Sequence, residues 1–166
     1  MILWVLGIAL LTAPAPADAQ DSCPAGRATR LVSNLIPAVG QSPIWAATGG
    51  KPLPWEGPGA PTRVLWVRDL AATGPPFLSG KLFGKQDKAP IAAFATSLYA
   101  SREPRLKLDF IGDKPPGIKD ADLKKYAFHW TFVWFPSPGC YAITGSVGSQ
   151  KSVIYLNVAA SAKKTP

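Results

Sequence analysis

Apolar and polar residues alternate along much of the chain with a period of two, which is the pattern of β-strands that pack one face against a core. In the segment RLKLDFIG, for example, Leu106, Leu108 and Phe110 fall on one face and the charged residues fall on the other. Runs of this kind are rich in β-branched and aromatic residues and are bounded by glycine and proline. The strands expected from them lie within 29–36, 42–50, 62–70, 76–84, 90–100, 105–112, 126–135, 140–147 and 152–158, although the alanines of 90–100 also suit a helix.

Two stretches between these runs do not read as strands. Residues 51–61 hold four prolines and two glycines, which leave few backbone donors for a ladder, so a loop is expected there. Residues 113–126 are polar, and one helical turn is expected near 119–125. Because strands do not alternate with helices, we predict an all-β fold in which two sheets bury their apolar faces against each other.

The composition favours a compact all-β domain. A length of 166 residues suits a single domain. Only 17% of the residues are charged, and 18 prolines with 15 glycines provide many turns. Six tryptophans and seven phenylalanines are too many for a disordered chain. We predict one domain over residues 20–158 and a flexible tail over 159–166.

The first nineteen residues have the features of a secretory signal peptide. An apolar run from Ile2 to Leu11 precedes an A-x-A cleavage site at 17–19, so that Gln20 becomes the first mature residue. The run is shorter than the roughly 20 apolar residues that span a bilayer. No lysine or arginine precedes it, and an uncleaved anchor or a core helix remains the alternative. We predict an exported protein, periplasmic or extracellular, without a transmembrane segment in the mature chain.

Basic residues outnumber acidic ones in the expected mature chain. Removing residues 1–19 takes away one acid, Asp18, and no base, which leaves 18 bases, 9 acids and a net charge of +9. Such a bias serves solubility, or it attracts anionic envelope polymers or lipid head groups. Lysine and arginine form only pairs, as in Lys124-Lys125, so nucleic acid is not an expected partner.

The chain has two cysteines, Cys23 and Cys140, near opposite ends of the mature sequence. In an exported protein two cysteines usually pair. Their disulfide would close a loop of a little over 100 residues and stabilise the fold by roughly 4–5 kcal/mol in the chain-entropy model. A free thiol or a metal ligand is the alternative, but no C-x-x-C spacing is present to build a metal site.

No set of residues indicates catalysis. His129 is the single histidine, no G-x-S-x-G element accompanies it, and a half-exposed position within a strand is expected for it. Asp120 and Asp122 lack the further oxygen ligands that Ca²⁺ requires. Nothing places Glu56 opposite Glu103, as a glycosidase would need. We predict no catalytic residue, no metal and no cofactor.

Aromatic residues are the strongest candidates for ligand binding. Five of them share one face of the expected strand 126–135: Tyr126, Phe128, Trp130, Phe132 and Trp134. Most of this row is expected to pack in the core, but its end can extend past the sandwich and stack on sugar rings. Trp45 and Trp55, near the Pro/Gly-rich loop, are the further candidates. Trp55 is expected to be exposed because prolines bracket it.

Four short motifs carry a family resemblance. They are an early mature cysteine, a P-I-W segment, a V-L-W-V strand followed by a glycine-containing strand, and a terminal F-P-x-P-G-C-[WY] hairpin. Here they are Cys23, Pro43-Ile44-Trp45, Val64–Val67 with Phe77–Phe83, and Phe135–Gly148. In these features the chain resembles uncharacterised small secreted bacterial proteins with an immunoglobulin-like sandwich. The resemblance implies export and an antiparallel immunoglobulin-like β-sandwich of about seven to nine strands; it implies no catalytic residues.

Together these observations predict a non-catalytic exported β-sandwich that binds an envelope component, which is a glycan, an anionic polymer or a protein. Two other functions remain open from the sequence. One is an envelope-associated hydrolase that would use Asp120, Asp122 or His129. The other is a purely structural role without a small ligand.

Overall fold

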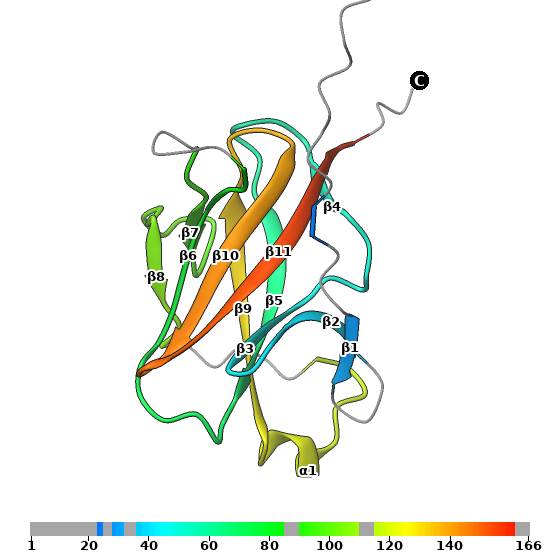
Figure 1. Ribbon diagram of the computed structural model, residues 1–166, viewed down its shortest axis with the longest axis vertical. Coiled ribbons are helices and arrows are strands. Elements are labelled where there is room, and N and C mark those ends of the chain that lie inside the picture. Colours follow the sequence, from blue (N-terminus) through cyan, green and yellow to red (C-terminus); the bar gives the residue numbers. More distant parts are fainter. Residues whose placement is uncertain (1–22, 25–27, 32–35, 85–89, 110–114, 162–166) are drawn as a thin grey trace, which may run out of the picture.

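The computed structural model describes residues 23–24, 28–31, 36–84, 90–109 and 115–161. In this part of the chain, eleven strands form two sheets that pack face to face, and one short helix is present (Figure 1). The all-β sandwich and the helical turn near 119–125 are therefore confirmed, with more strands than the seven to nine expected. The elements are β1 (Ala28–Leu31), β2 (Ile36–Gln41), β3 (Ile44–Ala47), β4 (Leu53–Trp55), β5 (Thr62–Asp69), β6 (Pro76–Leu82), β7 (Ala93–Ala95), β8 (Arg105–Lys107), α1 (Asp120–Leu123), β9 (Tyr126–Trp134), β10 (Gly139–Val147) and β11 (Gln150–Ala160).

The two sheets differ in size. The six-stranded sheet has the order β1-β2-β3-β5-β9-β7, and the five-stranded sheet has the order β4-β11-β10-β6-β8. In Figure 1, β10 and β11 pass in front of β5 and β9. Neighbouring strands are antiparallel except β4 and β11, which run parallel along three residues. The longest pairing is the predicted closing hairpin, in which β10 pairs with β11 from Gly139 to Val147.

The main core lies between the sheets. The six-stranded sheet contributes residues such as Trp66 and Val133, and the five-stranded sheet contributes residues such as Ile143 and Leu156. Trp66 is fully buried, and its indole N–H donates to the hydroxyl oxygen of Thr131 at 2.7 Å. This hydrogen bond satisfies two polar groups that would be costly to bury alone.

A second hydrophobic cluster lies on the other face of the six-stranded sheet. Its buried members are Ala38, Trp45, Leu65, Val67, Ile118 and Phe128. Ile118 comes from the segment before α1, so this segment covers part of the outer face. The expected aromatic row of β9 falls on this outer side, since Val133 and Phe135 of the opposite row belong to the main core.

Several boundaries differ from the sequence-based prediction. The expected loop 51–61 contains the short strand β4, and β11 continues through Ala159 and Ala160, which had been assigned to the tail. The strands β7 and β8 have only three residues each. The predicted signal peptide 1–19 and the end of the tail, 162–166, lie outside the described residues.

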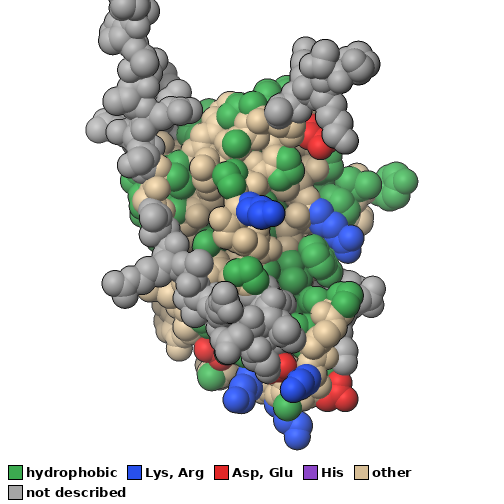
Figure 2. Space-filling view, turned by 90° about the vertical axis from the view of Figure 1, so that its right-hand side faces the viewer, with side chains coloured by type: hydrophobic (Ala, Val, Ile, Leu, Met, Phe, Trp, Pro, Cys, Tyr) green, Lys and Arg blue, Asp and Glu red, His purple; other side chains and the backbone are tan. Residues whose placement is uncertain are grey.

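Lysine side chains mark the end of the molecule that carries α1. Lys119, Lys124 and Lys125 are exposed around this helix, and Lys and Arg side chains gather at this end in Figure 2. Within the described part of the chain, no helix is long and apolar enough to cross a membrane.

Candidate functional site

A groove of about 560 Å³ lies on the outer face of the five-stranded sheet. We call it the sheet groove. It is lined by Ser79, Gly80, Lys81, Phe83, Ile91, Pro104, Ala142, Thr144, Val153 and Tyr155. These residues come from β6, β10 and β11, from the segment between β6 and β7, and from Pro104 immediately before β8.

The strand register explains why this face is hollow. Ala142 of β10 lies between Tyr155 of β11 and Lys81 of β6. One row further along the strands, Thr144 lies between Val153 and Ser79. Small side chains therefore form the floor over β10, and larger side chains from β11 form one wall.

The opposite wall is held beside β6 by backbone hydrogen bonds. The amide of Leu82 donates to the carbonyl oxygen of Pro90 at 3.0 Å, and the amide of Ala92 donates to that of Gly80 at 3.0 Å. Ile91 is thereby placed next to Lys81. Pro104, immediately before β8, completes the wall.

The sheet groove exposes apolar side chains to solvent. Ile91 is 57% exposed, Val153 is 45% exposed and Phe83 is 37% exposed. Phe83 and Tyr155 meet edge to face, with ring centroids 5.1 Å apart. The outer face of an antiparallel sheet is usually polar, and a contiguous exposed apolar patch marks an interaction site.

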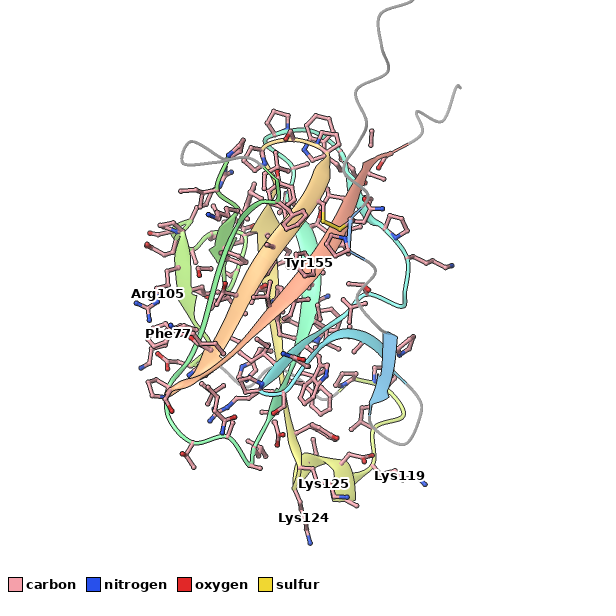
Figure 3. All side chains as sticks on the ribbon, in the orientation of Figure 1. Phe77, Arg105, Lys119, Lys124, Lys125 and Tyr155 are labelled. Carbon is pink, nitrogen blue, oxygen red and sulfur yellow. A yellow bond between two sulfur atoms is a disulfide. The ribbon has the colours of Figure 1, made fainter. Side chains whose placement is uncertain are left out.

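Cationic side chains surround the sheet groove. At one end, Lys151 and Lys107 flank Ser146 and Phe77 across the sheet. The guanidinium of Arg105 lies 4.1 Å from the ring centroid of Phe77. Figure 3 shows Tyr155 over the middle of the sheet and Phe77 and Arg105 towards its β8 side. The ammonium of Lys107 is 2.9 Å from Asp109, so its charge is partly neutralised.

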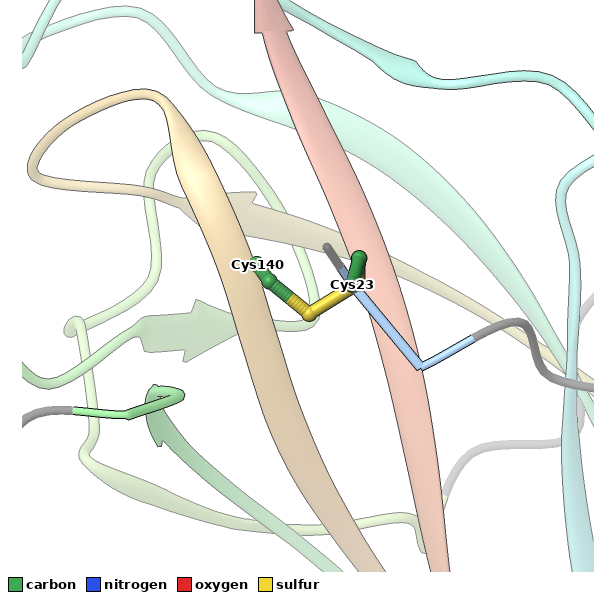
Figure 4. Close-up of a disulfide and its surroundings, with 2 residues drawn as sticks. All are labelled: Cys23 and Cys140. Atoms are coloured by element: carbon green, nitrogen blue, oxygen red, sulfur yellow. A yellow bond between two sulfur atoms is a disulfide. The ribbon is translucent and has the colours of Figure 1, made fainter. Parts of the chain in front are cut away.

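The predicted disulfide between Cys23 and Cys140 is confirmed, and it lies at the other end of the same face. Cys140 precedes Ala142 by one row and is paired with Asn157 of β11. Figure 4 shows the bridge reaching from β10 to the first described segment beside β11. A smaller hollow of about 340 Å³ lies there, lined by Cys23, Tyr155 and residues around Leu53.

Trp45 and Trp55, the two predicted ligand-binding residues, are not brought together. Trp45 is only 7% exposed, because it packs in the cluster behind the six-stranded sheet and meets Tyr126 edge to face at 6.2 Å. Trp55 belongs to β4 in the five-stranded sheet and is half-buried rather than exposed. Its indole N–H donates to the carbonyl oxygen of Phe135 at 2.9 Å. Neither residue lines the sheet groove.

Arginines lie over two tryptophans of the β9 aromatic row, the half-buried Trp130 and the buried Trp134. The guanidinium of Arg63 lies 4.2 Å from the ring centroid of Trp130. That of Arg102 lies 4.5 Å from the ring centroid of Trp134. The face of each ring that carries the guanidinium is not free to stack on a sugar, because the cation–π contact already occupies it.

The residues considered for hydrolysis lie apart from both hollows. His129 is only 1% exposed, which corrects the half-exposed position expected for it. It lies opposite Trp66 in the pairing of β5 with β9. It is buried because this face of β9 packs in the core between the sheets. Asp122 accepts a hydrogen bond from the amide of Lys119 at 3.4 Å as part of the cap of α1, and Asp120 is exposed. Among the described residues, no group of three His, Cys, Asp or Glu side chains is arranged to hold a metal ion.

Comparisons with family models, with curated proteins and with solved structures found no match to this chain.

Proposed function

We propose that the protein is a non-catalytic exported domain that binds an envelope component in the sheet groove. The observation that carries this proposal is the apolar surface of the sheet groove, on which Ile91, Val153 and Phe83 are exposed together and which no other described segment covers. Apolar area of this kind is costly in water, and a ligand that covers it gains about 25 cal/mol per Å².

The contrast between the two sheets supports this choice of surface. The outer face of the six-stranded sheet is also apolar, but Ile118 and the segment before α1 pack on it. Its remaining tryptophans lie under Arg63 and Arg102. Among the described residues, the chain therefore covers one apolar face with its own side chains and leaves the other open.

The charges around the sheet groove favour an anionic ligand. Lys81, Arg105 and Lys151 lie at its rim, and Asp109 is engaged by Lys107. Cations close to an apolar surface attract ligands that carry a negative group next to an apolar body. Export is supported by the signal-like first residues and by a disulfide, which persists in oxidising compartments. Membership in an immunoglobulin-like family remains part of the proposal.

Co-sedimentation with isolated cell-envelope material tests the proposal. Thr144→Trp fills the floor with an indole that strand β10 can carry on its outer face, and it should abolish co-sedimentation. Ala121→Trp adds the same side chain to an exposed position of α1 and should change nothing. Wild-type protein that stays in the supernatant, or a Thr144→Trp variant that sediments like wild type, would refute the proposal.

A further inference from the structure

We infer that the ligand of the sheet groove is a single anionic lipid amphiphile, whose acyl chain lies along the groove and whose head group meets Arg105 and Lys151. The inference rests on the proposed function, because it names the class of molecule that the same groove takes up.

The backbone beneath the groove favours an acyl chain over a polypeptide. The floor strand β10 pairs with β6 on one side and with β11 on the other, from Tyr141 to Val147. Its amide and carbonyl groups are therefore engaged within the sheet. A polypeptide laid on this floor would bury its own backbone groups without partners there, which costs free energy. An acyl chain has no polar group to satisfy.

The side chains of the groove argue against a glycan. Besides the rim residue Lys81, only Ser79, Thr144 and Tyr155 among the ten lining residues carry a polar side-chain atom. The nearby aromatic rings are partly engaged, since Phe83 and Tyr155 meet edge to face and Arg105 covers one face of Phe77. A sugar chain needs several directed hydrogen bonds together with open ring faces. The groove offers mainly apolar contact.

The two ends of the groove differ in charge, which gives the ligand a direction. Phe83, Ile91 and Tyr155 lie towards the disulfide end, where Lys81 is the cation among the described residues. At the other end, Lys107 and Lys151 lie in the row of Phe77. Arg105 is paired with Ser79, one row nearer the middle of the groove, and its guanidinium reaches over the Phe77 ring. Two acids, Glu103 and Asp109, lie on the segment that contains β8, and Asp109 is paired with Lys107. Within the described part of the chain, Arg105 and Lys151 are therefore the cations near Phe77 that have no carboxylate within ion-pair distance, and they suit a phosphate or carboxylate head group.

A chain-length series is the test. The purified, disulfide-bonded mature chain would be titrated calorimetrically with alkyl phosphates of about 8 to 14 carbons, each kept below its micelle concentration. Each further CH₂ group that enters the groove should tighten binding about fourfold, because burial of one CH₂ is worth about 0.8 kcal/mol. Once the groove is filled, longer chains should bring no further gain. Binding that does not depend on chain length would overturn the inference.

Charge variants test the position of the head group. Arg105→Gln with Lys151→Gln should weaken alkyl phosphate binding about tenfold or more and leave the neutral alkyl glucoside of the same length unchanged. Lys124→Gln with Lys125→Gln removes the same number of charges at the α1 end, which Figure 3 shows at a distance from Tyr155, and should have no effect. Equal losses in both double variants would contradict the assigned head-group position.

The two proposals fail in different ways. If Thr144→Trp abolishes co-sedimentation with envelope material while no alkyl phosphate binds, the groove is a binding site but its ligand is not a lipid. An acidic peptide that competes with envelope material in that situation would identify a protein partner and overturn the lipid inference. If Thr144→Trp leaves co-sedimentation intact, the proposed function fails together with the inference.

Discussion

Removal of the disulfide between Cys23 and Cys140 should lower the free energy of unfolding by about 5 kcal/mol. The bridge joins residues that are 117 positions apart. In the chain-entropy model, a cross-link that closes a loop of this length lowers the conformational entropy of the unfolded chain by about 16 cal/mol/K. This corresponds to about 5 kcal/mol of stabilisation at 25 °C. Domains of this size are stable by about 5–15 kcal/mol in total. The variant should therefore lie close to the limit of folding at physiological temperature.

The position of the bridge indicates what the loss would do to the fold. Cys23 precedes β1, which is the edge strand of the six-stranded sheet and pairs only with β2. Cys140 lies in β10, in the middle of the other sheet. The bridge therefore ties the first segment to the five-stranded sheet, while the pairing of β1 with β2 ties it to the six-stranded sheet. If this segment detaches alone without the bridge, the measured loss will be smaller than the full entropic value, and the slope of the denaturation curve will decrease.

Urea denaturation of the double variant Cys23→Ser with Cys140→Ser, followed by tryptophan fluorescence, measures both quantities. Wild-type protein under reducing conditions is the matched control and should give the same midpoint as the variant. A loss below about 1 kcal/mol with an unchanged slope would refute the argument, because the unfolded chain would then gain little freedom when the loop is opened.

Two further substitutions test the core and the turn between strands. Trp66→Phe should cost about 2–4 kcal/mol in thermal unfolding, because it leaves a cavity and a buried Thr131 hydroxyl without its indole partner. The double variant Trp66→Phe with Thr131→Val should lose less stability than the sum of the losses of the two single variants, because the second substitution removes the unpaired hydroxyl. A loss equal to that sum would argue against the hydrogen bond. Gly148→Ala should cost more than about 2 kcal/mol, since Gly148 has a positive φ of 57° and a Cβ there would collide with the carbonyl oxygen of Thr73. Gly59→Ala, where a Cβ meets nothing within 4 Å, should be nearly neutral by the same measurement.

The long strands could be read from the sequence because local pattern and tertiary position agree there. The segments 62–70 and 126–135 became β5 and β9, which pair with each other over eight residues. The closing hairpin was also predicted, since the turn at Gly148 separates two alternating runs. In these segments β-propensity and alternation lead to the same conclusion, and sheet packing reinforces it.

The strand β4 could not be read from the sequence because its pairing is made by a distant segment. The prolines of 51–61 argue against a strand, yet Leu53 to Trp55 pair with Val158 to Ala160 in parallel. Strand β4 lies at the edge of its sheet, and an edge strand tolerates proline because only one side of it is hydrogen-bonded. The same pairing extends β11 beyond Val158, where the tail was expected to begin.

The candidate site was missed because a period of two identifies which residues share a face but not which face meets the partner sheet. The aromatic row of β9 appeared suited to the core, but the opposite row, with Val133 and Phe135, packs between the sheets. In β11 the same ambiguity concealed Val153 and Tyr155, which alternate with buried residues and point outwards. Their exposure depends on contacts between strands that are distant in sequence.

The outer faces of the two sheets differ in how far other side chains pack on them, and this difference is the strongest reason to look for a ligand. Both sheets carry apolar side chains on their outer faces as well as in the core between them. On the six-stranded sheet, Ile118 packs on this outer face, and arginines lie over Trp130 and Trp134. If the five-stranded sheet needed only solubility, polar residues at positions such as Val153 would satisfy the pattern without loss of core packing. Instead a groove with a floor of small residues lies between apolar walls and beside cations. A ligand that covers this apolar surface would gain free energy from its burial and from the adjacent cations, which is why we propose the groove as the binding site.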